Sequence, residues 1–243
     1  MSVYDHLEEL RRRLLVSIIA LVVGSSVAFF FATRILRFLE GPMHGYTLHF
    51  TSPLEPLYAL LKISVGTGLI VAGPILLYQA VAFVLPALAR HERRLLYVYL
   101  PVATLLFFIG LAFGFFVFIP LVLQAMFRLS GTQLKPILTV GAYTSFLISF
   151  MLPFGAVFEM PVVVTLLVKL DILTAETLAR GRRWALLASA FIAAVFAPPD
   201  PVTPLVMAAP IYLLFEISIW VARLAGRKRA RGVTDADDSE GSH

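Results

Sequence analysis

The chain has 243 residues, of which 59% are hydrophobic and 14% are charged, and its mean hydropathy is +0.88. Soluble domains carry about 25% charged residues, so these values exclude an ordinary soluble protein and indicate one that is integral to a membrane. The sequence contains no cysteine, which excludes disulfides, thiolate catalysis and cysteine-based zinc sites.

Six apolar segments are candidates for membrane-spanning helices, because a span needs about 20 mostly apolar residues. Their approximate ranges are 14–32, 57–86, 95–127, 141–170, 184–197 and 205–220. The third and fourth are longer than the hydrocarbon core is thick, so we expect them to tilt or kink. The last two are short, and the residues between them include Pro198, Pro199 and Asp200, which rule out one continuous helix. We predict two short final helices joined by a tight turn; the alternative is an interfacial hairpin that never crosses the membrane.

The basic residues predict the orientation of this arrangement. Fifteen of the 20 lysine and arginine residues fall on one side of the six-span model, and the positive-inside bias then places both termini in the cytoplasm. The first apolar run is too long for the hydrophobic region of a signal peptide. We treat residues 1–231 as a single membrane domain and expect the polar, acidic tail of residues 232–243 to be disordered.

No motif for covalent chemistry is present. The sequence has no phosphate-binding loop, no zinc-protease motif and no nucleophile elbow, and its five histidines show no metal-ligand spacing. We therefore expect no catalytic residues, no metal, no cofactor and no binding of nucleic acid. The glycines at 66 and 68 lie inside an apolar segment and predict close helix packing.

Two acids near the predicted cytoplasmic surface are candidates for binding. Glu9 belongs to an amphipathic segment in which Arg12 and Arg13 lie at the i+3 and i+4 positions, so an ion-paired, solvated helix start is the structural alternative. Glu92 has only leucine and alanine at its i±3 and i±4 positions, so helical spacing gives it no partner of its own. The alternative for Glu92 is a carboxylate at the rim of the protein, bathed in water.

Three further acids lie within or beside the apolar segments. Glu159 is the most costly, because a charged carboxylate at mid-bilayer costs roughly 2.5 to 3.5 kcal/mol on insertion scales. It must be protonated or face a polar cavity, which makes it a functional candidate. Asp200 fits a structural role, since aspartate in such turns accepts backbone hydrogen bonds, and Glu216 is a further polar residue in the last segment.

Four motifs in chain order resemble the TatC family, the multispan subunit of the twin-arginine protein translocase. They are residues 6–13, 78–94, 154–161 and 198–200. The resemblance covers nearly the whole chain except its tail. It implies an all-α membrane protein with six transmembrane helices in a glove-shaped bundle, two short last helices and both termini cytoplasmic.

The resemblance also implies a function. Members of the family recognise signal peptides with consecutive arginines on folded cargo and recruit the single-span proteins TatA and TatB. Cargo then crosses the bacterial inner membrane at the expense of the proton-motive force, without covalent chemistry. Glu9 and Glu92 match the acids that hold the arginine pair, Arg11 and Phe83 match the surrounding recognition surface, and Glu159 matches the acid on the concave side of the bundle. We expect contacts with membrane lipids and assembly into homo- and hetero-oligomers.

A second hypothesis from another class is a proton-coupled secondary transporter that uses Glu159 as its relay. The two halves of the sequence show no obvious internal repeat, which disfavours it. A membrane-embedded enzyme is a third hypothesis, and no set of nucleophile, base or metal ligands supports it.

Overall fold

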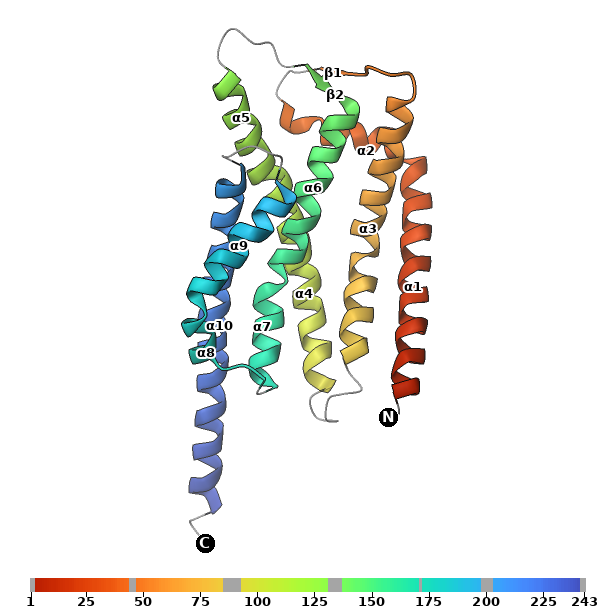
Figure 1. Cartoon of the computed structure of the whole chain (residues 1–243). Helices are drawn as coiled ribbons and strands as arrows, with labels where there is room; N and C mark the ends of the chain where they lie inside the picture. Colours follow the sequence, from red (N-terminus) through yellow and green to blue (C-terminus); the bar gives the residue numbers. More distant parts are fainter. Residues whose placement is uncertain are drawn as a thin grey trace. The chain divides into compact units, whose positions relative to one another are not determined.

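The computed structural model describes residues 3–43, 47–84, 93–130, 137–170, 172–197 and 203–240. These residues are almost entirely helical (Figure 1), as the sequence predicted. Their contacts group the chain into two compact units, residues 1–155 and residues 156–243. The treatment of residues 1–231 as one membrane domain stays a prediction.

Unit 1 contains six α-helices that begin within its described residues, a short π-helical segment, a 3₁₀ turn and two short strands. In chain order they are α1 (Val3–Phe30), α2 (Ala32–Leu39), η1 (Gly41–Met43), β1 (Leu48–His49), α3 (Glu55–Val84), α4 (Arg93–Phe113), η3 (Gly114–Phe118), α5 (Ile119–Ser130), β2 (Leu138–Thr139) and α6 (Val140–Phe158). The division between the units falls within α6, after Gly155.

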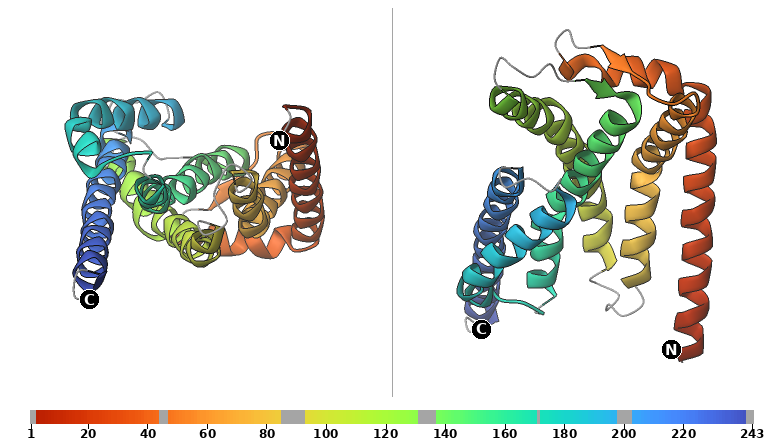
Figure 2. Two further views of the ribbon diagram at one scale, coloured as in Figure 1. Left: turned by 90° about the horizontal axis from the view of Figure 1, so that it is seen from below. Right: turned by 45° about the horizontal axis from the view of Figure 1, so that its top comes forward.

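The first two long helices of unit 1, α1 and α3, pack side by side (Figure 2). Glycine makes this approach possible. A Cβ atom added to Gly68 of α3 would lie 2.3 Å from Ser25 Oγ and 2.5 Å from Ser25 N of α1, and one added to Gly24 would lie 3.0 Å from Gly68 O. The predicted role of Gly68 in close helix packing is confirmed. Small residues matter here because lipid tails are as apolar as leucine, so helix association in a membrane depends on close contact.

The end of unit 1 remote from its N-terminus is tied together by backbone pairing. Strands β1 and β2 pair in parallel, with Leu48 opposite Leu138 and His49 opposite Thr139. The buried Tyr143 of α6 donates a hydrogen bond of 2.6 Å from its hydroxyl to the carbonyl of Leu39, at the end of α2. These contacts join segments about 90 to 100 residues apart in the sequence, and no sequence pattern predicted them.

Unit 2 consists of α7 (Met160–Lys169), α8 (Ala175–Arg180), α9 (Arg182–Phe196) and α10 (Thr203–Glu240). Helix α10 packs against both α7 and α9. Glu159 separates α6 from α7, and Pro161 occupies the first turn of α7. Proline suits this position because its missing N–H has no partner at a helix start, whereas inside a helix it removes a hydrogen bond.

Five segments among the described residues are long and apolar enough to cross a membrane. They are Tyr4–Phe30, Glu55–Phe83, Tyr99–Arg128, Val140–Lys169 and Thr203–Leu224. They correspond to five of the six predicted spans. The remaining one, 184–197, lies in α9, whose 15 residues extend about 22 Å and fall short of a membrane core of about 30 Å.

Helix α10 is longer than the predicted span 205–220. Its backbone is helical from Thr203 to Glu240. The expected disorder of residues 232–243 stays a prediction. Alanine, arginine and lysine dominate residues 222–231, and these strong helix formers continue the helix beyond the apolar segment. The predicted turn at Pro198, Pro199 and Asp200 lies outside the described residues.

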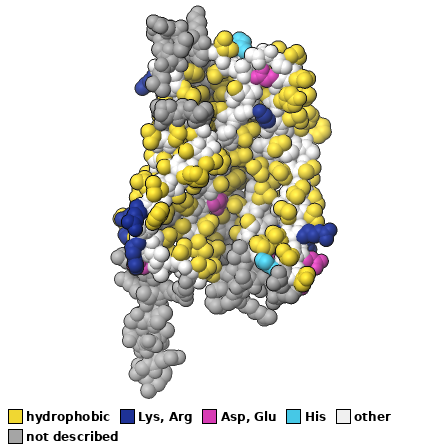
Figure 3. Space-filling model, viewed as in Figure 1, with side chains coloured by type: hydrophobic (Ala, Val, Ile, Leu, Met, Phe, Trp, Pro, Cys, Tyr) yellow, Lys and Arg dark blue, Asp and Glu magenta, His cyan; other side chains and the backbone are white. Residues whose placement is uncertain are grey.

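Exposed side chains agree with a membrane environment. Large hydrophobic side chains such as Ile19, Phe30 and Phe116 are 61%, 83% and 65% exposed. In Figure 3 hydrophobic side chains cover most of the middle of the face shown, and charged side chains lie mainly toward the ends of the helices. Such apolar surface is compatible with lipid as the solvent and not with water.

Candidate functional site

A polar cluster lies where the start of α1 meets the end of α3. We call it the α1–α3 cluster; its members are His6, Glu9, Arg13, Gln79 and Phe83. The three α1 residues are spaced by three and four positions, and the two α3 residues by four, so each set occupies one helix face. Because the two helices run antiparallel, the faces meet in register.

Arg13 is the centre of this cluster. Its guanidinium donates to Glu9 Oε1, with an Nε–Oε1 distance of 3.1 Å, and its Nη1 donates to Gln79 Oε1 over 3.2 Å. The ion pair is about four-fifths buried, with side-chain exposures of 22% for Arg13 and 19% for Glu9. Glu9 Oε2 is buried and has no hydrogen-bond partner among the described residues. The carboxylate therefore keeps one unused acceptor oxygen.

The ring of His6 stacks on Phe83 beside this ion pair. The ring centroids are 4.4 Å apart, with an angle of 26° between the planes. An aromatic surface thus borders the carboxylate of Glu9, and such a combination can accept a cation that carries a flat or apolar stem.

The structure brings together two of the residues predicted from the sequence, Glu9 and Phe83. It selects Arg13 as the partner of Glu9, out of the two arginines that helical spacing allowed. Arg11 is exposed. Glu92 lies outside the described residues, so its predicted place beside Glu9 stays a prediction.

Glu159 lies at the junction that precedes α7, in unit 2. Its side chain is 8% exposed, and its carbonyl accepts the backbone N–H groups of Val162 and Val163 at 3.0 Å. The expectation that this acid is protonated or faces a polar cavity stays a prediction. Its predicted functional role remains a proposal.

Glu216, which the sequence marked only as a polar residue in an apolar segment, has a specific partner. Arg182, at the start of α9, makes a two-pronged contact with it: Nη2 to Oε2 at 2.9 Å and Nε to Oε1 at 2.9 Å. Tyr212, one turn earlier in α10, donates its hydroxyl to Glu216 Oε1 at 2.9 Å. These bonds join α9 to α10 and explain how a carboxylate is accommodated there.

Four residues that contact the predicted acids, Phe83 or Arg13 were not predicted from the sequence: His6, Gln79, Arg182 and Tyr212. The only sequence signal for Gln79 and His6 is helical spacing relative to Phe83 and Glu9, at four and three residues. Nothing local to Arg182 indicates Glu216, which is 34 residues away.

A chain with several long apolar helices, small residues at their contacts and ion pairs near their ends is a multi-span membrane protein. Residues 5–210 match the family model described as "Sec-independent protein translocase protein (TatC)". The match covers most of the chain, which therefore belongs to the TatC family of protein translocase components.

Relatives from distant bacteria agree with this assignment. The TatC protein of Aquifex aeolicus is 42% identical over 235 residues, covering 94% of this chain and 98% of the relative. The TatC protein of Escherichia coli K12 is 34% identical over 243 residues, covering 97% of this chain and 94% of the relative. A crystal structure described as "Twin Arginine Translocase Receptor- TatC" is 41% identical, with a TM-score of 0.83, and the similarity covers 91% of this chain and 99% of that one.

Proposed function

We propose that this protein is the signal-peptide receptor and core subunit of a twin-arginine translocase in a bacterial inner membrane. It exports folded cargo using the proton-motive force, with both of its termini in the cytoplasm and with TatA and TatB as partners. Membership in the TatC family supports this proposal, as does the likeness at 41% identity to a chain described as a translocase receptor.

The observation that carries the receptor role is the state of Glu9. Its Oε2 atom is buried and hydrogen bonds to no described residue, although a buried carboxylate oxygen ordinarily has a partner. An arginine of a signal peptide supplies the N–H groups that are missing there. Guanidinium suits the task better than ammonium, because its planar fork makes two parallel bonds to one carboxylate.

Two consecutive arginines need two acceptors, and Glu92 is the proposed second one. It belongs to the same motif as Phe83, nine residues along the chain, and Phe83 contacts the α1–α3 cluster through His6. On this proposal Glu9 and Glu92 each hold one arginine, while His6 and Phe83 contact the peptide's apolar stem.

Binding of a twin-arginine signal peptide to the full-length protein in lipid nanodiscs tests the proposal. We expect a peptide with an Arg-Arg pair to bind at least about tenfold more tightly than its Lys-Lys version, because hydrogen bonds to charged groups contribute about 1.5 to 3 kcal/mol. Glu9→Gln should remove most of this difference, and Glu92→Gln should do the same. Glu8→Gln is the matched control, since Glu8 is an exposed acid at the adjacent position. Equal affinities for the two peptides would contradict the receptor role.

Arg13 is expected to compete with the incoming arginine for Glu9. Arg13→Gln removes the internal partner of Glu9 and one positive charge. Without that partner the Glu9 carboxylate is free to bind the peptide, so twin-arginine peptides should bind several-fold more tightly. Arg12→Gln removes the same charge from an exposed side chain in the same turn. Competition predicts a larger gain for Arg13→Gln than for Arg12→Gln in the same peptide titration. An equal gain for the two variants means that the effect is one of net charge only.

A further inference from the structure

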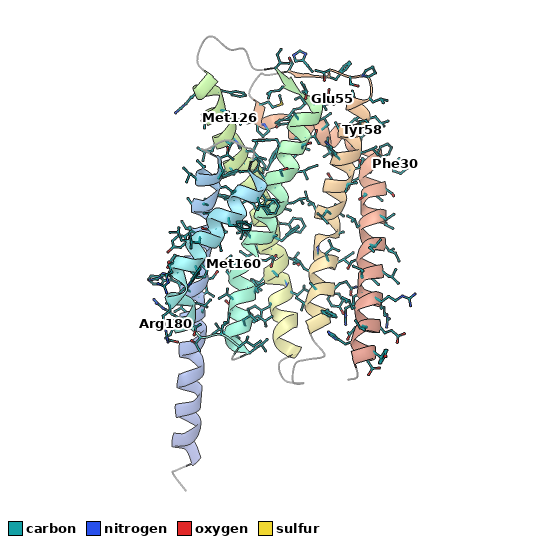
Figure 4. The ribbon with its side chains drawn as sticks, viewed as in Figure 1. Phe30, Glu55, Tyr58, Met126, Met160 and Arg180 are labelled. Atoms are coloured by element: carbon teal, nitrogen blue, oxygen red, sulfur yellow. The ribbon has the colours of Figure 1, made fainter. Side chains whose placement is uncertain are left out.

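A groove with a volume of about 860 Å³ lies between α3 and α6 in unit 1, at the end remote from the α1–α3 cluster. Figure 4 shows two of its residues, Glu55 and Tyr58, in the first turns of α3 close to the strands. Its walls are mainly apolar. The principal apolar side chains are Tyr58, Leu61, Val65 and Leu69 from α3 and Ile148 and Leu152 from α6.

The dimensions of the groove match one leaflet of a bilayer. Leu69 follows Glu55 by 14 positions, or about 21 Å along α3, against about 20 to 22 Å for one leaflet with its headgroup region. The groove lies within the apolar segments Glu55–Phe83 and Val140–Lys169. Gly66 forms part of its floor, where a Cβ atom would lie 3.1 Å from Ile148 Cδ1, so the two helices are in close contact there.

The acid at the mouth of the groove is already fully engaged. Glu55 Oε2 accepts from the backbone N–H of Thr51 at 2.7 Å and from its hydroxyl at 2.9 Å, while Oε1 accepts from the N–H of Gly141 at 2.9 Å. The bond to Gly141 satisfies an amide at the start of α6, where a negative charge is favourable. Glu55 therefore has a structural role, and its carboxylate is not used to neutralise Lys62, the cation in the groove.

Lys62 lies about 10 Å along α3 from Glu55. Its ammonium donates to Ser145 Oγ at 2.8 Å, and Ser145 in turn donates to the carbonyl of Gly141. Ser145 is neutral, and no carboxylate lies within ion-pair distance of Lys62 among the described residues. An ammonium has three N–H donors, so two remain to bind an anion. A cation inside an apolar segment is costly without such a partner.

We propose that this groove binds one anionic phospholipid, with its phosphate on Lys62 and Ser145 and an acyl chain along the apolar wall toward Leu69 and Leu152. The phosphate supplies the negative charge and the acceptor oxygens that Lys62 lacks. The acyl chain covers apolar surface that a small soluble anion leaves exposed. The site is separate from the signal-peptide site, so its occupancy does not depend on the proposed function.

Native mass spectrometry of the delipidated full-length protein in detergent tests the proposal with defined lipids. We expect one phosphatidylglycerol to bind in preference to phosphatidylcholine, and Lys62→Gln to weaken that binding at least about fivefold. Arg37→Gln is the matched control, because Arg37 is an exposed cation on α2 at the same end of unit 1. Ser149→Phe is a second variant: it keeps every charge and fills the groove beside Ile148, and it should also displace the lipid.

Three results would overturn the lipid site. The first is an equal loss of phosphatidylglycerol binding in Lys62→Gln and Arg37→Gln, which would mean that the anionic lipid is attracted to any surface cation. The second is unchanged binding in Ser149→Phe, which places the lipid elsewhere. The third is displacement of the lipid by millimolar inorganic phosphate, which shows that Lys62 binds a soluble anion without help from the acyl chain. Circular dichroism and melting temperature for each variant confirm that the fold is retained.

Discussion

Replacing Gly68 with leucine is expected to push α1 away from α3 and to lower the thermal stability of the protein in detergent. A Cβ atom at this position would lie 2.3 to 2.6 Å from the hydroxyl, amide nitrogen and Cα of Ser25. Two of these three atoms are backbone, so rotation of a side chain cannot relieve the overlap. Overpacking costs typically 1 to 3 kcal/mol, occasionally more. For a chain of this size, a loss of that order lowers the melting temperature by about 2 to 12 °C.

A graded glycine-to-alanine series checks the cause of this effect. Gly68→Ala should destabilise the protein most. Gly66→Ala should destabilise it less, since the obstructing group is the flexible side chain of Ile148 at 3.1 Å, and Gly41→Ala should have almost no effect, because nothing lies within 4 Å. Size-exclusion profiles after heating steps give the order. If Gly41→Ala is as harmful as Gly68→Ala, close packing of α1 on α3 is not the cause.

Reversing the charge of Glu216 is the second substitution with a large expected effect. Glu216→Arg sets two guanidiniums against each other where a two-pronged ion pair now joins α9 to α10, and it deprives the Tyr212 hydroxyl of its acceptor. Exposed ion pairs contribute little, but this one has side-chain exposures of 45% and 27% and joins a helix that is short for a span. We expect the melting temperature to fall by at least about 5 °C.

The double variant Arg182→Glu with Glu216→Arg restores opposite charges and should recover part of the loss. Glu176→Arg is the control, because Glu176 is an exposed acid on α8 in the same unit. A double variant no more stable than Glu216→Arg would show that the ion pair does not hold α9 and α10 together. Melting curves of the wild-type protein, Arg182→Glu, Glu216→Arg and the double variant in one detergent form the double-mutant cycle.

The α1–α3 cluster illustrates how far local spacing predicts a site. Helical periodicity placed Glu9 within reach of Arg12 and Arg13, and the structure confirms the second of these pairs. Spacing could not bring in Gln79, which is 66 residues from Arg13, because that contact depends on the register of α3 against α1. The glycine at 68 predicted close packing but not the helix that it faces.

Glu55 and Lys62 show the same limit at the other end of unit 1. Both residues lie near the start of an apolar segment, and their sequence neighbours do not indicate which of the two has a charged or polar partner. Only the position of α6 gives Glu55 the amide of Gly141 and leaves Lys62 with a neutral serine. The difference between an engaged acid and an available cation is therefore a tertiary property.

The sequence by itself determined three things: that this protein is integral to a membrane, which residues form its apolar helices, and to which family it belongs. Hydropathy and helical periodicity depend only on residues that are near each other in the sequence, so they can be read without knowledge of the fold. The tertiary structure decided which charges are paired, as in Arg13 with Glu9 and Arg182 with Glu216, and where a groove is left between helices. Those outcomes depend on contacts of a few ångströms between helices, and the register that sets such contacts is fixed only when the helices pack.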